Sequence, residues 1–131
     1  MRPPFVDTSV WYALVDARDV NHEQAVSLMA RPRQAVITTN VVFAESLTLA
    51  RKRLGHDSAV GLGRRLLDGR GVRLLRVESS DEKQAWQIFQ RSHDKDFSFT
   101  DCTSFAVMRR LRLAHAFAFD RHFQQMGFRV N

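Results

Sequence analysis

The stretch that decides the fold class is AVITTNVVFAESLTLARKRL, residues 35–54. Its first five residues, Ala35–Thr39, are apolar or β-branched and predict a strand that is covered on both faces. The following residues predict a helix over Asn40–Leu54, because apolar side chains recur along one side of it. A buried strand that runs directly into an amphipathic helix is typical of a β-α-β crossover. The apolar side chains of the helix are Phe43, Leu47, Ala50 and Leu54.

The same alternation continues along the rest of the chain. Strands joined by helices indicate an α/β fold, a three-layer sandwich with a central, mainly parallel sheet. Repeats and linkers are absent from the sequence, which predicts a single domain over residues 1–131. The predicted strands are Pro4–Asp7, Ala35–Thr39, Val72–Val77, Ala116–Phe119 and Phe128–Val130. The predicted helices are Asn21–Met29, Asn40–Leu54, Ser58–Leu67, Ser80–Ser92, Phe99–Leu113 and Arg121–Met126.

The composition is that of an ordinary globular protein, with 44% hydrophobic and 26% charged residues. The longest apolar runs, such as Ala116–Phe119, are too short to span a bilayer, and residues 1–5 lack the apolar stretch of a signal peptide. Cys102 is the only cysteine, which excludes an intrachain disulfide and a cysteine metal cluster. These features predict a protein of the reducing cytoplasm with no membrane partner.

The charge balance favours a polyanionic partner. The chain has 20 Lys and Arg residues against 14 Asp and Glu residues, and most of the basic residues are arginine. The planar guanidinium fork matches phosphate oxygens two at a time, so RNA or DNA is the first partner to consider. The alternative is that a GC-rich genome uses arginine codons, and composition leaves both explanations open. Candidates for backbone binding are Arg51, Lys52, Arg53, Arg64, Arg65, Arg109 and Arg110.

Four acidic residues fall where an α/β fold builds its sites. Asp7 and Asp120 end predicted strands, so both should leave a parallel sheet at the same edge, where such folds bind ligands. Glu45 lies on an apolar helix face and should be at least partly buried, and Asp101 lies in the first turn of its helix. Each acid has a simpler explanation. Asp7 and Asp120 could cap the following helices, Asp101 fits a capping box with Ser98, and Glu45 could be an ordinary surface residue.

Taken together, the four acids predict a metal site. Carboxylates are buried together at a high cost unless a proton, an arginine or a metal neutralises them. An all-oxygen set with no histidine or cysteine nearby selects Mg²⁺ or Mn²⁺ over zinc. Such a site can hold phosphate and activate water for phosphodiester cleavage. Asp7 and Asp101 are the first choices as ligands, then Glu45, and Asp120 is the one least expected to contact metal directly.

Four segments resemble the PIN domain, and most closely its prokaryotic branch, the VapC-type toxins of toxin–antitoxin pairs. The resemblance covers essentially the whole chain, with the motifs in the family's order. It implies a PIN-like α/β sandwich and an endoribonuclease that depends on Mg²⁺ or Mn²⁺. The segments are Phe5-Val6-Asp7-Thr8-Ser9-Val10-Trp11, Thr39-Asn40-Val41-Val42-Phe43-Ala44-Glu45, Ser98-Phe99-Thr100-Asp101-Cys102-Thr103-Ser104-Phe105-Ala106-Val107-Met108 and Phe117-Ala118-Phe119-Asp120-Arg121-His122-Phe123.

The resemblance also implies roles for particular residues. Asp7, Glu45, Asp101 and Asp120 match the family's metal site. Activated water would then attack phosphorus in line and leave a 5′-phosphate and a 3′-hydroxyl. Asp94 falls where the family often has a further acid, but a solvated loop charge is the simpler interpretation. Residues matching supporting positions, which orient carboxylates or water, are Thr8, Ser9, Asn40, Thr100 and Ser104.

Partners follow from the resemblance alone. Family members commonly form homodimers, and the toxins are inhibited by a small antitoxin protein. A stand-alone RNA-processing nuclease and a non-catalytic RNA-binding module are the alternatives. A phosphatase with a strand-end Asp nucleophile would need a second acid where this chain has Ser9, and a receiver domain would need a late strand-end lysine.

Overall fold

The computed structural model describes residues 2–131, and within this range it contains one five-stranded sheet with the strand order β3-β2-β1-β4-β5. Every neighbouring pair is parallel, so the prediction of a mainly parallel sheet is confirmed. The strands are β1 (Phe5–Val6), β2 (Val36–Thr39), β3 (Val72–Leu75), β4 (His115–Phe117) and β5 (Arg129–Val130). The helices are α1 (Thr8–Val15), α2 (His22–Ala30), α3 (Asn40–Leu54), α4 (His56–Asp68), α5 (Ser79–Arg91), α6 (Phe99–Arg110) and α7 (His122–Gln125).

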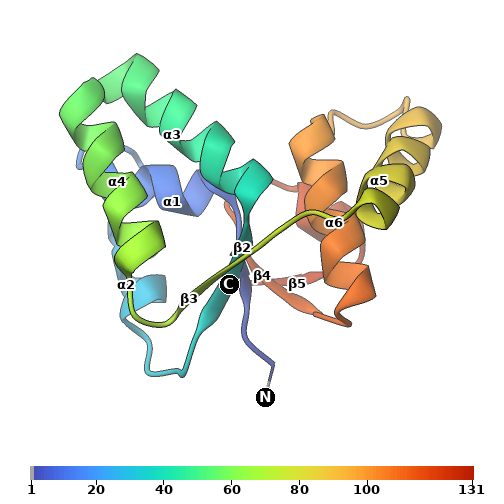
Figure 1. The fold of residues 1–131 in the computed structure, drawn as a ribbon, viewed down its shortest axis with the longest axis horizontal. Helices are drawn as coiled ribbons and strands as arrows, with labels where there is room; N and C mark the ends of the chain where they lie inside the picture. The colour runs from blue at the N-terminus through green and yellow to red at the C-terminus, as the bar shows by residue number, and fades with distance from the viewer. Residues whose placement is uncertain (1) are drawn as a thin grey trace.

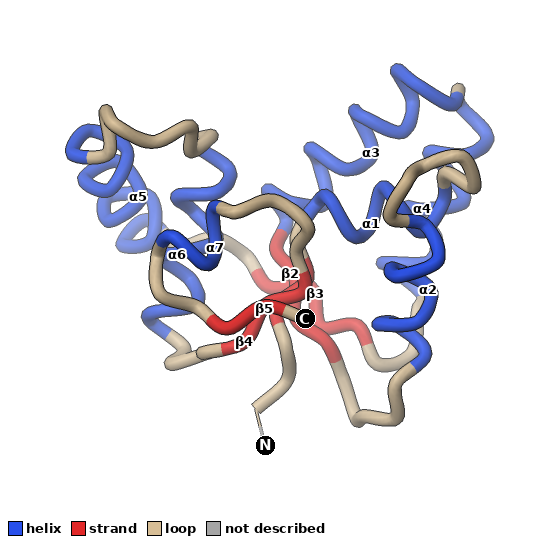
Figure 2. Tube along the Cα trace, turned by 180° about the vertical axis from the view of Figure 1, so that it is seen from behind, coloured by secondary structure: helices blue, strands red, loops and turns tan. Residues whose placement is uncertain are grey.

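The helices form two layers around the sheet. Helices α1 to α4 lie on one side of the strands, and α5 and α6 lie on the other (Figure 1). The reverse view shows the strands gathered between these two groups (Figure 2). The three-layer α/β/α sandwich is therefore confirmed. None of the helices within residues 2–131 is long and apolar enough to cross a membrane.

Helix α1 has no counterpart among the predicted helices, but the alternative that Asp7 caps a following helix is confirmed, because Asp7 is the N-cap of α1 and accepts a hydrogen bond from Ser9 N. Six of its eight residues are buried, so the helix is apolar nearly all round and shows no amphipathic stripe. Its Trp11 is fully buried, and the indole Nε1 donates a hydrogen bond to Thr38 Oγ1 at 3.2 Å. This bond ties α1 to the centre of β2, the element that lies beside β1 in the sheet.

Several boundaries differ from the prediction. Strand β4 ends at Phe117, two residues earlier than expected, and β3 ends at Leu75 instead of Val77. Helix α6 ends at Arg110, because Arg112 adopts a left-handed backbone conformation (φ 56°) that no α-helix can contain. Apolar residues beyond these ends stay at least partly buried, which is why hydrophobicity alone extended the elements.

Phenylalanine rings fix helix α6 in the core. Phe105 is fully buried and packs edge-on against Phe97 and Phe123, with ring centroids 5.0 Å apart in both pairs. Residues 101–108 of α6 are all buried. Because aromatic pairs of this kind restrict the positions of both rings, the helix that carries Asp101 has little freedom to shift.

Cys102 gives a simple test of this packing. Its side chain is fully buried, and burial raises the pKa of the thiol to about 11, with the charge of Asp101 adding to the shift. Because the thiolate is the reactive form, we expect the native protein at pH 8 to resist a thiol-specific reagent and to react fully after denaturation. Stoichiometric labelling of the native protein, followed by absorbance, would contradict the packing described for α6.

Candidate metal centre

Three acidic residues meet at the carboxyl ends of the strands. Asp7 directly follows β1, and its backbone N–H donates to Phe117 O at the end of β4 (3.0 Å). Asp120 lies three residues beyond the end of β4, in the turn that leads to α7. Asp101 lies in the first turn of α6. Because all the strands are parallel, these carboxylates share the edge of the sheet at which α/β folds bind ligands.

Asp7 is buried and held in place by Ser9. Only 3% of the residue is exposed, and one carboxylate oxygen accepts hydrogen bonds from Ser9 Oγ (2.7 Å) and Ser9 N (3.2 Å). The same hydroxyl oxygen accepts a bond from Phe119 N at 3.2 Å, so Ser9 links Asp7 to the segment before Asp120. Burial, together with the charges of Asp120 and Asp101, raises the pKa of Asp7 to about 7, although the Ser9 hydrogen bonds oppose the shift.

Asp101 both caps its helix and faces the other acids. Its carboxylate accepts a hydrogen bond from Ser98 N at 3.0 Å while Ser98 Oγ accepts from Asp101 N, so the predicted capping box is present. Burial raises the pKa of Asp101, the Ser98 bond opposes this, and the charge of Asp120 supports it. Asp101 therefore caps helix α6 and can belong to the acidic site at the same time.

His122 is the residue that sequence reasoning missed. Its Nδ1 lies 2.7 Å from Asp101 Oδ2 and 3.7 Å from Asp120 Oδ1. Asp101, Asp120 and His122 each offer a ligand atom, and these atoms lie within 4.8 Å of one another. The expectation that no histidine lies near the acids was wrong, because α7 turns His122 back over Asp101. Its position two residues after Asp120, at a predicted helix start, was the available signal.

Glu45 lines a hollow of its own on helix α3. It is half-buried, and together with Thr100 it lines a hollow of about 470 Å³ between α3 and α6, which none of the other three acids lines. Asp101 and Asp120 form a group with His122, and Asp7 lies outside this group but near enough for the charges of Asp120 and Asp101 to raise its pKa. The structure thus brings Asp7, Asp101 and Asp120 near one another and places Glu45 beside Thr100, the residue that precedes Asp101.

The predicted supporting residues fall into two groups. The hydroxyls of Thr8 and Ser104 are buried without a hydrogen-bond partner within residues 2–131. Thr8 directly follows Asp7, and Ser104 lies one turn after Asp101 along α6. Such groups can each hold a water molecule or a ligand oxygen. Asn40 instead accepts a bond from Val77 N (2.8 Å) and fixes the chain after β3. A role for Asn40 in orienting the carboxylates stays a prediction, as does one for Thr100.

Three of the remaining charged candidates lie elsewhere, whereas Lys52 lines the same hollow as Glu45. Asp94 is exposed and pairs with Lys95 at 2.7 Å, as expected of a solvated loop charge. Arg110 is engaged by the buried Asp81, with bonds of 2.8 and 2.9 Å. Arg65 lines a hollow that begins at the opposite edge of the sheet. Of these two candidates for backbone binding, Arg110 is therefore held by Asp81, and Arg65 lies at the other edge of the sheet.

The residues present fit a hard divalent cation. Raised pKa values at Asp7 and Asp101 mean that burial and mutual repulsion disfavour their charged forms. A cation at this edge would relieve both effects, and carboxylate oxygens are the ligands that Mg²⁺ and Mn²⁺ prefer. His122 adds one nitrogen atom, whose contact with Asp101 orients that carboxylate.

Comparisons with known proteins identify the family to which this fold belongs. The PIN domain model matches residues 5–129. The chain is 42% identical over 124 residues to the "23S rRNA-specific endonuclease VapC20" of Mycobacterium tuberculosis, covering 95% of this chain and 94% of the relative. The crystal structure of VapC20, described as a "Sarcin-Ricin loop cleaving toxin", matches with a TM-score of 0.90 at 40% identity over 95% of both chains.

More distant proteins share the fold. The chain is 25% identical over 114 residues to a "VapC ribonuclease" of Archaeoglobus fulgidus, covering 82% of this chain and 71% of the relative. The structure of FitAcB from Neisseria gonorrhoeae matches with a TM-score of 0.68 at 19% identity, covering 96% and 94% of the two chains, which shows likeness of fold. From the match over nearly its whole length, this chain belongs to the PIN domain family.

Proposed function

We propose that this chain is an endoribonuclease that depends on Mg²⁺ or Mn²⁺ and acts as the toxin of a toxin–antitoxin pair. The observation that carries the proposal is the burial of Asp7 beside Asp101 and Asp120 at the carboxyl edge of the sheet. A protein that only bound RNA would gain nothing from these acids, since they repel phosphate when no metal is bound. The family and the names of the relatives support RNA as the substrate.

The proposed reaction is hydrolysis of a phosphodiester bond, with water adding to phosphorus in line with the departing 3′ oxygen. Asp7, Asp101 and Asp120 would hold the metal, and Glu45, which lines a hollow with Thr100 beside Asp101, would be a further ligand. A bound divalent cation would lower the pKa of water and neutralise charge on the phosphate. Ser9 fixes the position of Asp7, and His122 fixes that of Asp101. The products would carry a 5′-phosphate and a 3′-hydroxyl.

The direct test is cleavage of structured RNA. Because a 42% identical relative is named as specific for 23S rRNA, a sarcin–ricin stem-loop is the first substrate, with transfer RNA as a comparison. We expect cleavage with Mg²⁺ or Mn²⁺ and none with a chelator. Asp57→Asn, which removes an exposed acid of α4, is the control for charge and should cleave normally. A chain that binds Mn²⁺ in calorimetry but cleaves neither RNA would contradict the proposed activity.

The toxin role has a separate test in cells. One relative is described as a toxin, which supports an antitoxin partner encoded beside this chain and cytoplasmic action on RNA. We expect induced expression to arrest growth, and co-expression of a short neighbouring reading frame to restore it. Active protein that never slows growth would favour the stand-alone RNA-processing nuclease instead. Sedimentation of the purified chain tests the proposed homodimer.

Ser9→Ala should weaken metal binding. The change removes the hydroxyl that donates to Asp7 and accepts from Phe119 N, so Asp7 loses both an oriented position and a group that favours its charged form. Loss of such an orienting partner costs about tenfold to a hundredfold in metal affinity. Mn²⁺ calorimetry measures the effect, with the exposed Ser27→Ala as the matched control. Equal affinities of the two variants would show that Ser9 does not position Asp7.

A further inference from the structure

A second charged region lies at the edge of the sheet opposite the acidic site. Two hollows, of about 260 and 650 Å³, share four lining residues, Arg31, Arg33, Gln34 and Ala35. Their walls include the residues that precede or begin the strands, such as Pro4, Ala35, Gly71 and His115. Because all strands are parallel, this is the edge at which they start, whereas Asp7 and Asp120 follow their ends. We call these two neighbouring hollows together the basal hollow.

Arginine dominates the basal hollow. Neither of its two parts is lined by an Asp or Glu residue. Within the described residues 2–131, none of the lining arginines takes part in a salt bridge. Clustered positive charges repel one another, and the neighbouring Arg31, together with burial, lowers the pKa of Arg33. The lining arginines are Arg2, Arg31, Arg33, Arg65, Arg70 and Arg73.

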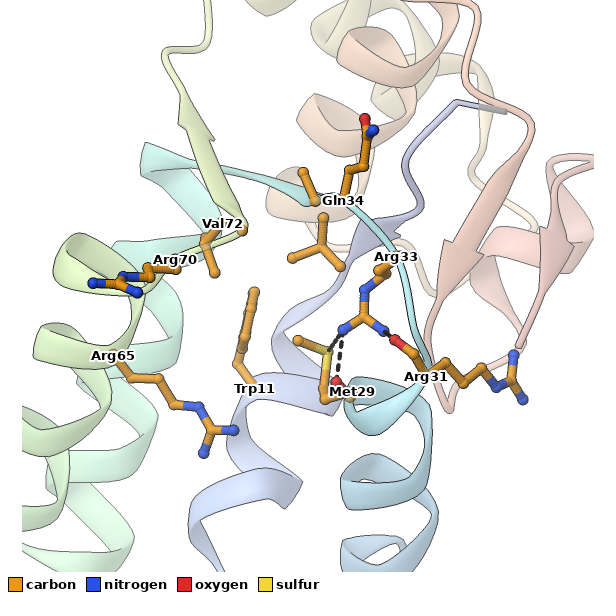
Figure 3. Close-up of a pocket in the computed structure, with 12 residues that line it drawn as sticks. Trp11, Met29, Arg31, Arg33, Gln34, Arg65, Arg70 and Val72 are labelled. Carbon is orange, nitrogen blue, oxygen red and sulfur yellow. Dashed lines mark hydrogen bonds between the residues drawn. The ribbon is translucent and has the colours of Figure 1, made fainter.

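Some of these arginines form a fixed frame. Arg33 donates to the carbonyls of Leu28 (3.0 Å) and Met29 (2.9 Å) at the end of α2, and its guanidinium lies beside Met29 (Figure 3). Arg2 donates to the carbonyl of Leu111 at 2.8 Å. These bonds hold two guanidinium groups at the hollow. Because the acceptors are neutral backbone carbonyls, the positive charge of both groups is not neutralised.

Other groups of the basal hollow are free to meet a ligand. Arg65, Arg70 and Arg73 are exposed and make no side-chain hydrogen bond to another described residue, and Arg65 reaches from α4 toward Trp11 in Figure 3. His115 lines the larger part, and its Nε2 is buried without a hydrogen-bond partner among residues 2–131. A polar atom left in this state is expected to bind water or a ligand oxygen.

We propose that the basal hollow binds backbone phosphates of RNA at a distance from the acidic site. The guanidinium fork matches phosphate oxygens, and two neighbouring arginine-lined hollows that share Arg31 and Arg33 suit successive phosphates of a polymer better than one small anion. The longest strands, β2 and β3, have four residues each, so about 13 Å of strand separates the two edges. A folded RNA can span that length and contact both edges. The identity of this RNA as the cleaved substrate rests on the proposed function.

The test compares RNA binding by two charge-matched triple variants. One carries Arg65→Gln, Arg70→Gln and Arg73→Gln in the basal hollow, and the control carries Arg18→Gln, Lys83→Gln and Arg91→Gln at exposed positions outside it. A stem-loop RNA is titrated over a range of salt concentrations in EDTA, so that no cleavage occurs. Thermal unfolding first establishes that both variants are folded.

We expect the basal variant to bind RNA roughly tenfold to a hundredfold more weakly at 0.1 M salt. The slope of the logarithm of its association constant against the logarithm of salt concentration should be smaller in magnitude by about 2. The control should keep the slope of the wild type. A third variant, in which Arg65, Arg70 and Arg73 are replaced by lysine, should also keep the slope of the wild type. The slope depends on the number of positive charges that contact phosphates, and lysine keeps this charge. Equal affinity and slope of the basal and control variants would overturn the proposal.

Two other probes separate the sources of the anion. If inorganic phosphate binds the wild type and RNA affinity is the same in every variant, the hollow holds a small anion and the RNA assignment fails. If polyglutamate binds as tightly as RNA and loses affinity in the basal variant, the surface fits an acidic protein and the assignment also fails. RNA cleavage is scored separately. A wild type that never cleaves contradicts the proposed function and leaves this comparison valid.

Discussion

Asp7→Asn should remove RNA cleavage and, at the same time, stabilise the metal-free protein. Loss of an orienting partner alone costs up to about a hundredfold at metal sites, so loss of a ligand carboxylate should cost at least that much. The amide oxygen can still accept the bonds from Ser9, so the local structure should survive. Removing a buried charge with a pKa of about 7 should add up to about 4 kcal/mol of folding stability at pH 8.

The sign of the stability effect depends on pH. In the unfolded chain Asp7 ionises near 3.8, whereas in the fold its pKa is about 7, so unfolding releases a proton between these values. The wild type should therefore lose stability relative to Asp7→Asn as pH rises from about 4 to about 7. Above that range the difference should be constant, and near pH 4 it should vanish. Denaturant unfolding of chelator-treated protein at several pH values measures this.

Metal and a matched variant complete the test. Mn²⁺ should stabilise the wild type more than Asp7→Asn, since only the native site binds it well. Asp57→Asn should leave both stability and cleavage unchanged, because its carboxylate is exposed. An Asp7→Asn protein that is less stable than wild type at pH 8 would mean that the charged form of Asp7 is favoured by the fold without metal.

Arg110→Met should destabilise the protein by about 2–3 kcal/mol, because it leaves Asp81 buried and unpaired. Asp81 is 2% exposed and receives bonds from Arg110 Nε at 2.8 Å and Nη2 at 2.9 Å. We expect a smaller loss of folding stability than for a fully buried ion pair, because the Arg110 side chain is 32% exposed. Methionine keeps most of the apolar stem, so the lost ion pair should dominate.

Arg109→Met is the matched control on the same helix. Arg109 is exposed, and its substitution should change stability by less than about 0.5 kcal/mol. Burial opposes ionisation of Asp81, but the bonds from Arg110 lower its pKa overall. The stability that the pair contributes is therefore present above the ordinary pKa and should be lost as pH falls below about 4. Equal unfolding midpoints for the two variants at pH 7 would contradict the role assigned to Arg110.

The sequence predicted the elements with strong periodicity and missed the one without it. Helix α3 begins and ends where its apolar stripe predicts, because one of its faces packs on the core and the other faces solvent. Helix α1 was missed, because it is covered on nearly all sides and its sequence reads as one apolar run. The strand ends were extended for the same reason, since buried turn residues such as Ala118 are as apolar as strand residues.

In the candidate site, the acids could be placed from the sequence but the arginines could not. The predicted acids of the strand ends do meet, since a parallel sheet places Asp7 and Asp120 at one edge whatever the details of packing. Arginine could not be ranked from the sequence, because the roles of Arg65 and Arg110 depend on neighbours far away in the chain. Arg110 pairs with Asp81, which lies 29 positions earlier.

By itself, the sequence determined the order of the strands and of the helices other than α1, and the acids that follow the strands, because periodicity and strand direction are local properties of the chain. Only the tertiary structure decided that His122 contacts Asp101, that Glu45 lines a hollow with Thr100, and that arginines gather at the opposite edge. These contacts join residues from separate elements. Distances of this kind are set by how the layers pack, and no spacing within one segment encodes them.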